Sequence, residues 1–254
     1  MEHQHNTEEN KSAVKKSTVG TPAAIMAAAV IIALAIVYTH FAPTVPAPTI
    51  PTGGQQAPAG NKGATPPTVN IKNVKIDGEP FVGEINAPVT IAYWSDYQCP
   101  FCKKFELDTL PKVMDAYVKT GKVKIVFKDF QFLGNDSITG ALYDRAVWDL
   151  YPTQYFEWRT AMYTNQDQEG DQGFGNETSV KQLTATILGS GAADKVAATV
   201  KANNAKYLAE IDADKQEGSD MGITGTPGFV IGTQAYSGYE PYTQFSSELD
   251  AVLK

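Results

Sequence analysis

The sequence is poor in the residues that most often carry metal and nucleophile chemistry, with only two cysteines and three histidines in 254 residues. Two cysteines cannot build the multi-bridge framework of a small disulfide-stapled domain. All three histidines lie within the first 40 residues, so the long remainder offers no imidazole for a Cys–His pair or a His-ligated metal. These absences direct attention to the cysteine pair itself, Cys99 and Cys102.

Basic residues are also scarce, and the formal net charge of the whole chain is −7. Residues 71–254 hold 17 Lys and Arg against 25 Asp and Glu, so this part is more acidic still. Binding to nucleic acid or to an anionic membrane surface is driven by clustered positive charge. We therefore expect no nucleic-acid partner.

Long apolar runs are absent except for one, Ala23–Tyr38, which is sixteen uncharged and almost wholly apolar residues. This length is near the minimum for crossing a bilayer and long for the apolar part of a signal peptide. Three lysines precede the run and the next basic residue is Lys62, so the positive-inside rule places the N-terminus in the cytoplasm. The sequence predicts a cytoplasmic tail over 1–20 and an uncleaved transmembrane anchor over 21–41, with a cleaved signal peptide as the alternative.

The segment 42–70 has seven prolines and neither Asp nor Glu. Its composition cannot bury enough apolar surface to fold, and its prolines keep the chain extended. It is predicted to be a disordered linker between the anchor and a folded extracytoplasmic domain over 71–254. The expected location is therefore the cell membrane, with a single span and the C-terminal domain outside.

The two cysteines form the motif Cys99-Pro100-Phe101-Cys102, directly after the apolar run Val89–Trp94. On the first turn of a helix, residues i and i+3 share a face, so the two sulfurs can form a disulfide. The helix N-terminus favours a thiolate at the first cysteine, and proline suits the first helical position. The motif indicates a redox-active dithiol, with a structural clip or a metal site as the alternatives.

The hydrophobic pattern predicts the order β-α-β, a helical block and then β-β-α. The expected strands are Val89–Trp94, Lys122–Phe130, Gly228–Ile231 and Thr233–Tyr236. The expected helices are Pro100–Tyr117 with a kink at Pro111, then Ser137–Leu150, Thr153–Tyr163, Ser179–Leu188, Ala192–Glu217 and a final helix with Tyr242, Phe245, Leu249 and Val252 on one face. This order is an α/β thioredoxin fold with a helical insertion over about 136–218.

A second motif, Thr226-Pro227, lies far along the chain, just before the third predicted strand. An X-Pro bond at this place can be cis and can bring backbone groups beside the dithiol, where they could pair with an extended substrate. The stretch GEINAPVTIAYWSDYQCPFCKKFE resembles the active-site signature of the DsbA-like thioredoxin family, and GITGTPGFVIG resembles its cis-proline loop.

The resemblance implies a thiol–disulfide oxidoreductase that needs no cofactor beyond a Cys99–Cys102 disulfide. Cys99 is then the attacking thiolate and Cys102 the resolving thiol. Pro100, Phe101, Thr226 and Pro227 are the expected substrate-contacting residues. We expect the protein to form disulfides in secreted or surface proteins and to pass electrons to a membrane redox partner. The alternatives are a reductase or isomerase with the same site, or a non-catalytic binding module with an inert disulfide.

Two positions depart from the family pattern. Phe101 stands where strongly oxidising members have histidine, so the Cys99 thiolate is expected to depend on the helix terminus and on Lys103 and Lys104. Tyr93 stands where thioredoxins carry a buried acid, so the sequence offers no evident proton acceptor for the second cysteine. Asp96 is close in sequence, either as a turn or cap residue or as a proton relay.

The stretch Asn165-x-Asp167-x-Glu169-Gly170 approximates the start of a calcium-binding loop. The twelfth position, which supplies a bidentate carboxylate in such loops, is Asn176, so the pattern is out of register. We expect a solvated acidic loop there, and no metal site.

Overall fold

The computed structural model describes residues 69–167 and 171–254. The predicted tail over 1–20, the anchor over 21–41 and nearly all of the linker lie outside the described residues. Within the described ranges, no helix is both long enough and apolar enough to cross a membrane.

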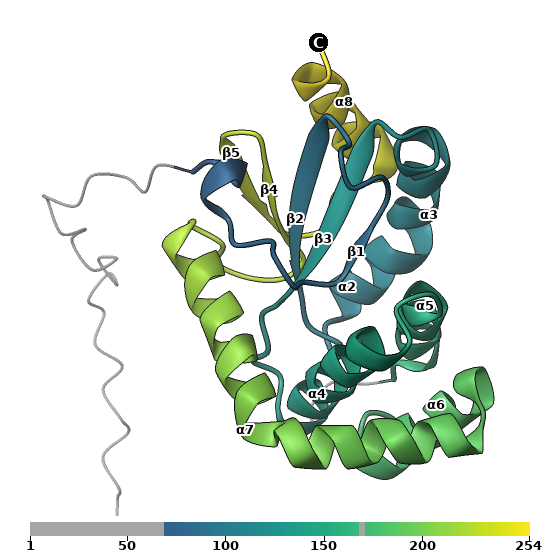
Figure 1. Ribbon diagram of the computed structural model, residues 1–254. Coiled ribbons are helices and arrows are strands. Elements are labelled where there is room, and N and C mark those ends of the chain that lie inside the picture. The colour runs from purple at the N-terminus through teal and green to yellow at the C-terminus, as the bar shows by residue number, and fades with distance from the viewer. Residues whose placement is uncertain (1–68, 168–170) are drawn as a thin grey trace, which may run out of the picture. The chain divides into compact units, whose positions relative to one another are not determined.

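A five-stranded sheet forms the centre of the domain, with the strand order β1-β3-β2-β4-β5 (Figure 1). Strands β2 and β3 run parallel, and the other three neighbouring pairs are antiparallel. The strands are β1 (Phe81–Val82), β2 (Val89–Ser95), β3 (Val123–Asp129), β4 (Gly228–Ile231) and β5 (Gln234–Ser237). The sequence did not predict β1, because two residues are too short a stretch to show an alternating pattern.

The two parallel strands are the interior of the sheet. Strand β3 is buried along its whole length and β2 is buried at every residue except Thr90. Their β-branched and aromatic residues suit a pleated surface that is covered on both faces. A parallel pair needs a crossover connection, and here a helical segment provides it. The turn that follows the segment contains Gly121, whose φ of +73° favours glycine.

The crossover segment is not the single helix that the sequence predicted. It consists of α2 (Pro100–Lys104), a π-helical turn η2 (Phe105–Thr109), α3 (Leu110–Val113) and a second π-helical turn η3 (Met114–Val118). Pro111 has no N–H to donate to the preceding turn, which is the physical reason for an irregular ladder around it. The two wide turns lie on either side of the short helix that contains Pro111.

Four helices lie between β3 and β4 and form the predicted insertion. They are α4 (Asn135–Leu150), α5 (Tyr155–Asn165), α6 (Glu177–Leu188) and α7 (Ser190–Asp220). Figure 1 shows them gathered beside one end of the sheet, and α5 packs against α2 and η2. The fold is a thioredoxin core interrupted by a helical block, as the sequence predicted.

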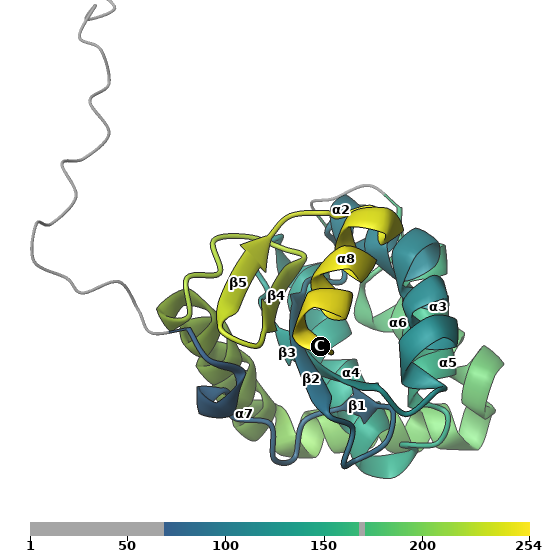
Figure 2. The same cartoon turned by 90° about the horizontal axis from the view of Figure 1, so that it is seen from above.

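The last helix, α8 (Tyr242–Val252), and α3 cover one face of the sheet, while α7 lies on the other face (Figure 2). Phe245 and Leu249 of α8 are buried, as the pattern predicted. The prediction was wrong for Val252, which is 44% exposed. Its side chain lies against the turn at Gly232, which has no side chain to cover it.

A cluster of aromatic side chains fills the space beneath α2 and α8. Tyr93 of β2 stacks on Phe229 of β4, with ring centroids 4.9 Å apart. Phe105 contacts both of these rings and Phe245, at centroid distances of 4.7–5.1 Å. Each such pair adds about 0.5–1.5 kcal/mol beyond the burial of its area, so the cluster fixes the helices on the sheet.

A buried charge network joins the insertion to the sheet. Lys128 of β3 lies 2.5 Å from Asp214 of α7 and 3.2 Å from Glu79. Arg145 of α4 pairs with Asp129 at 2.7 Å, with Asp214 at 2.5 Å and with Glu79 at 3.0 Å. These five residues are called the Arg145–Lys128 network below. Both of its cations have two or more carboxylate partners, which buried charges require.

Candidate active site

The two cysteines lie at the start of α2, one turn apart. Cys99 is the N-cap residue, and Cys102 lies in the first turn. The Cys99 amide donates to the backbone oxygen of Asp96 at 3.1 Å, which folds the chain from β2 into the helix. Both cysteines are free thiols, with 4% of Cys99 and none of Cys102 exposed. Cys102 is the more deeply buried thiol, and Cys99 is less exposed than the resemblance implies for an attacking thiolate.

Sheet pairing brings the second motif to the dithiol. Strand β4 pairs with β2 through Trp94 and Gly228, so the loop just before β4 lies at the end of β2 from which α2 begins. The Thr226–Pro227 peptide bond is cis, as the sequence suggested. The Cys99 Sγ donates to the Thr226 carbonyl oxygen at 3.4 Å. Residues 127 positions apart therefore form one site.

The two thiols have opposite acidities. A hydrogen bond from Cys102 is the largest cause that lowers the pKa of Cys99 to about 6, while burial opposes it. Thr226 and the backbone amides of Cys102 and Phe101 lower it further, which is the expected contribution of a helix N-terminus. Burial is the main cause that raises the pKa of Cys102 well above its ordinary value. At neutral pH the pair is one thiolate and one thiol.

The expectation for the neighbouring lysines was wrong. Lys103 Nζ donates to the backbone oxygen of Gln166 at 2.5 Å, and Lys104 Nζ lies 4.3 Å from the centroid of the Tyr239 ring. Both ammonium groups are thus held by other partners, and neither is among the main causes of the Cys99 pKa. The physical reason is that each ammonium group has a partner of its own, the Gln166 carbonyl oxygen for Lys103 and the Tyr239 ring for Lys104.

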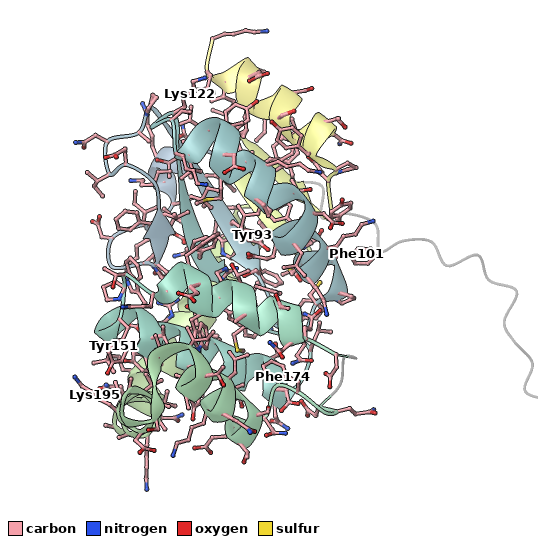
Figure 3. All side chains as sticks on the ribbon, turned by 90° about the vertical axis from the view of Figure 1, so that its right-hand side faces the viewer. Tyr93, Phe101, Lys122, Tyr151, Phe174 and Lys195 are labelled. Carbon is pink, nitrogen blue, oxygen red and sulfur yellow. The ribbon has the colours of Figure 1, made fainter. Side chains whose placement is uncertain are left out.

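Pro100 and Phe101 are on the surface beside the dithiol. Phe101 is 58% exposed, so its ring does not fill the core, and Figure 3 shows it at the periphery of the domain. A large exposed aromatic side chain next to a thiolate is available to a bound partner. The roles predicted for these residues, and for Thr226 and Pro227, remain predictions that the geometry accommodates.

Asp96 organises the turn before the helix. Its Oδ1 accepts from the Gln98 amide at 2.8 Å and its Oδ2 from the Phe132 amide at 2.9 Å. Burial raises the pKa of Asp96, and these backbone bonds oppose the rise. Both carboxylate oxygens therefore have backbone partners, which supports the reading as a turn and cap residue.

The structure supplies a buried acid that the sequence analysis missed. Glu106 lies four residues after Cys102 on the same helical segment, and it is buried. Arg159 of α5 holds it through Nε and Nη2, which both donate to Glu106 Oε1, at 2.9 and 2.7 Å. Burial raises the pKa of Glu106, while Arg159 and the hydroxyl of Tyr93 oppose the rise.

Arg159 is fixed by hydroxyl groups and rings as well as by the carboxylate. Nη2 also donates to Ser95 Oγ at 2.8 Å and Nη1 to the Tyr97 hydroxyl at 3.1 Å. The guanidinium carbon lies 4.2 Å from the centroid of the Phe127 ring, which is a close cation–π contact. We call Arg159, Glu106 and the side chains around them, namely Tyr93, Ser95, Tyr97, Phe127, Asp144, Tyr155 and Tyr163, the Arg159 network.

The sequence could have indicated only one member of this ion pair, Glu106. The spacing of four between Cys102 and Glu106 could have identified the acid, since i and i+4 share a helix face. Arg159 is 53 positions away and reaches the site only because the insertion folds back on α2. No periodicity in the sequence could have indicated that contact.

The acidic loop after α5 is partly described. Asp167 Oδ2 accepts from the Phe174 amide at 2.5 Å, and Asp171 Oδ1 accepts from the Asp136 amide at 2.8 Å. Glu169 and Gly170 lie outside the described residues. Across 69–167 and 171–254, no group of three or more His, Cys, Asp or Glu side chains is arranged to hold a metal ion.

A thioredoxin fold with two thiols one helical turn apart beside a cis-proline loop defines a class, the thiol–disulfide oxidoreductases. Comparison with known proteins agrees: a family model described as thioredoxin matches residues 75–251. The chain belongs to the thioredoxin family, and within it this protein is a DsbA-like oxidoreductase.

The similar proteins are bacterial. Disulfide bond formation protein D of Bacillus subtilis is 26% identical over 184 residues, which cover 70% of this chain and 79% of that protein. The crystal structure of oxidised BdbD from Bacillus subtilis superimposes with a TM-score of 0.63 at 21% identity, over 75% of this chain and 99% of that one. Alpha-DsbA2 from Wolbachia pipientis gives a TM-score of 0.59 at 25% identity, over 68% and 87% of the two chains.

Proposed function

We propose that this protein forms disulfide bonds in extracytoplasmic proteins by donating a Cys99–Cys102 disulfide. The observation that carries the direction of the reaction is the lowered pKa of Cys99, about 6. A pKa of about 6 in place of the ordinary 9.0 corresponds to about 4 kcal/mol in favour of the thiolate, which exists only in the reduced enzyme. Stabilisation of the reduced form raises the reduction potential, so that the enzyme disulfide readily oxidises substrate thiols.

The reaction has two exchange steps. A substrate thiolate attacks the Cys99 Sγ, the bond between the two enzyme sulfurs breaks, and Cys102 Sγ leaves with the electron pair. A second substrate thiolate then attacks the substrate sulfur of the mixed disulfide, and Cys99 leaves as a thiolate. The substrate dithiol loses two electrons and the enzyme gains them. The low pKa of Cys99 makes it the better leaving group in the second step.

Substrate contacts are proposed at the surface around the dithiol. An extended segment of an unfolded protein can pair with the backbone of the Thr226-Pro227 loop, as a strand pairs with a sheet edge. Phe101, two residues after Cys99, offers an exposed apolar surface, and Pro100 between them is exposed as well. These contacts favour unfolded protein substrates over small thiols.

Membrane attachment through 21–41 is part of the proposal, with the linker over 42–70 and the catalytic domain outside the cell membrane. Its support is the apolar run with lysines on one side only. The name of the Bacillus relative, disulfide bond formation protein D, agrees with the proposed formation of disulfide bonds. A membrane redox partner would reoxidise the dithiol, because each turnover leaves two electrons on it.

The proposal is tested by trapping substrates in cells. Cys102→Ser removes the resolving thiol, so mixed disulfides between Cys99 and client proteins accumulate and migrate as adducts on non-reducing gels. Cys99→Ser is the matched control and forms no adducts. Absence of adducts with Cys102→Ser, while Cys99 still reacts with an alkylating reagent, overturns the assignment of Cys99 as the attacking thiol.

A further inference from the structure

A buried side-chain amide joins the helical insertion to the turn that carries Cys99. Gln166 is the C-cap residue of α5, and only 4% of it is exposed. Its Nε2 donates to the backbone oxygen of Tyr97 at 2.7 Å and to that of Cys99 at 3.1 Å. An amide nitrogen carries two N–H groups, so both are used on this turn.

The backbone of Gln166 is held at the same place. Its N–H donates to the backbone oxygen of Tyr163 at 3.3 Å, where α5 ends, and its carbonyl oxygen accepts from Lys103 Nζ at 2.5 Å. Lys103 follows Cys102 in α2, and α5 packs beside α2 (Figure 1). The insertion and the helix of the dithiol therefore fix the amide from both sides.

The amide is arranged to donate to the turn. Its Oε1 is buried and accepts no hydrogen bond from the described residues. Turning the amide over would set this oxygen against two backbone oxygens, so the acceptors decide which way the amide faces. A buried polar atom that lacks a partner calls for an explanation besides stability. The two donated bonds provide one.

The two carbonyl oxygens lie in the segment that sets the acidity of Cys99. The Cys99 oxygen also accepts the first backbone bond of α2, from the Lys103 amide at 3.0 Å, so its direction fixes the start of the helix. The amides of Phe101 and Cys102 at this start lower the pKa of Cys99. A carbonyl oxygen without its donor would oppose them, because its negative end disfavours a nearby thiolate.

We propose that Gln166 is a positioning residue for the dithiol, whose amide holds the Tyr97 and Cys99 carbonyl oxygens so that the N-terminus of α2 faces the Cys99 sulfur. The inference rests on the proposed exchange function, in which Cys99 is the thiolate released in the second step. Gln166 acts through the backbone of the turn. The insertion thereby contributes to the chemistry of Cys99 as well as to the fold.

The test follows the acidity of Cys99 in Gln166→Met, which keeps the length of the side chain and removes both donors. The thiolate is titrated by its ultraviolet absorbance in the reduced, full-length protein. We expect the midpoint to rise by about one pH unit, because a hydrogen bond is worth roughly a tenfold change in an equilibrium. The equilibrium with glutathione at pH 7 should then shift about fivefold toward the protein disulfide.

The matched control is Gln98→Met. Gln98 is also a buried glutamine beside the dithiol, and its Oε1 also accepts no hydrogen bond from the described part of the chain. Its Nε2 donates to the backbone oxygen of Phe174 at 3.2 Å, so this bond also joins the core to the insertion, but its acceptor lies in the insertion and not in the turn. The titration midpoint of this variant is expected at the wild-type pH.

A second variant, Gln166→Glu, keeps the length and polarity of the side chain and so tests the same contact if Gln166→Met does not fold. A carboxyl group has at most one donor in place of two, and when ionised it has none. The midpoint should therefore rise in this variant as well. Urea denaturation of each variant measures the accompanying loss of stability.

Two results overturn the proposal. In the first, a folded Gln166 variant titrates at the wild-type pH although its free energy of unfolding falls, so that the contact is structural only. In the second, Gln98→Met raises the midpoint equally, so that any loosening of the insertion has this effect. Failure of the proposed function looks different: the wild-type protein itself then keeps its disulfide against glutathione, and the difference between the variants still decides the role of Gln166.

Discussion

Two buried cation networks hold the helical insertion on the thioredoxin core, and they differ in what surrounds their cations. In the Arg145–Lys128 network two cations meet three carboxylates at 2.5–3.2 Å. In the Arg159 network one guanidinium has one short carboxylate contact, with Glu106, and aromatic rings and hydroxyls provide the rest. Only the second lies beneath the dithiol.

The difference lies in where each network meets the rest of the protein. In the Arg145–Lys128 network each cation is held by two or more carboxylates, and removing a cation would leave those buried charges uncompensated. The Arg159 network is built on Glu106, which follows Cys102 by four residues on the same helical segment. The insertion therefore does more than enlarge the fold, since it delivers the cation that holds the acid of the redox site.

The largest expected effect is on the free energy of unfolding, and it is the same for the two networks. Arg145→Leu and Arg159→Leu each leave buried carboxylates without their cation, so each should lower the free energy of unfolding by about 3–5 kcal/mol in urea denaturation. Only Arg159→Leu should also change the reduction potential. An equal change of potential in Arg145→Leu would remove the distinction between the networks.

The second effect concerns the dithiol alone. It is measured as the free energy of unfolding of the reduced protein and of the oxidised protein across a range of pH. The folded pKa of Cys99, about 6, is below its ordinary 9.0, so the thiolate stabilises the reduced protein fully above pH 9. This stabilisation is lost as the pH falls through 6. Between pH 9 and pH 6 the free energy of unfolding of the reduced protein should fall by about 3 kcal/mol relative to that of the oxidised protein. Both forms contain both networks, so parallel pH curves would contradict the assignment.

A smaller effect separates charge from geometry in the Arg159 network. Arg159→Lys keeps the positive charge but loses the forked contacts to Glu106 and Ser95, and should cost about 1–2 kcal/mol in the same unfolding experiment. Because the positive charge beside Glu106 remains, this variant should shift the reduction potential less than Arg159→Leu does. An equal shift of potential in the two variants would mean that the forked geometry, and not the charge, is what matters.

The smallest effect is at the surface. Phe101→Ala should change the free energy of unfolding by less than about 0.5 kcal/mol, because the ring is 58% exposed. The same variant should raise KM for an unfolded protein substrate and leave exchange with glutathione unchanged. A loss of stability comparable to that of the network variants would show that the ring is part of the core.

The sequence predicted the parts of the site that depend on local spacing. Cys99 and Cys102 share a helical turn, and the strand before them is a plain apolar run, so period and capping rules suffice. The Thr226-Pro227 loop could be placed because β4 follows it directly and the order of elements fixes where β4 pairs.

The parts that were missed depend on contacts between distant segments. Arg159 reaches Glu106 across 53 positions, and the directions of Lys103 and Lys104 are set by Gln166 and Tyr239. Burial decides the acidity of Cys102, and it arises only when α5 packs on α2 and η2. Spacing along the chain carries no information about such packing.

The most direct test of the account is the reduction potential of the purified protein, equilibrated in glutathione buffers and read by thiol trapping. A thiolate stabilised at Cys99 predicts a potential well above about −200 mV, so that the disulfide is readily donated. A value near or below about −270 mV would contradict the account, because the dithiol would then act as a reductant or remain as an inert disulfide.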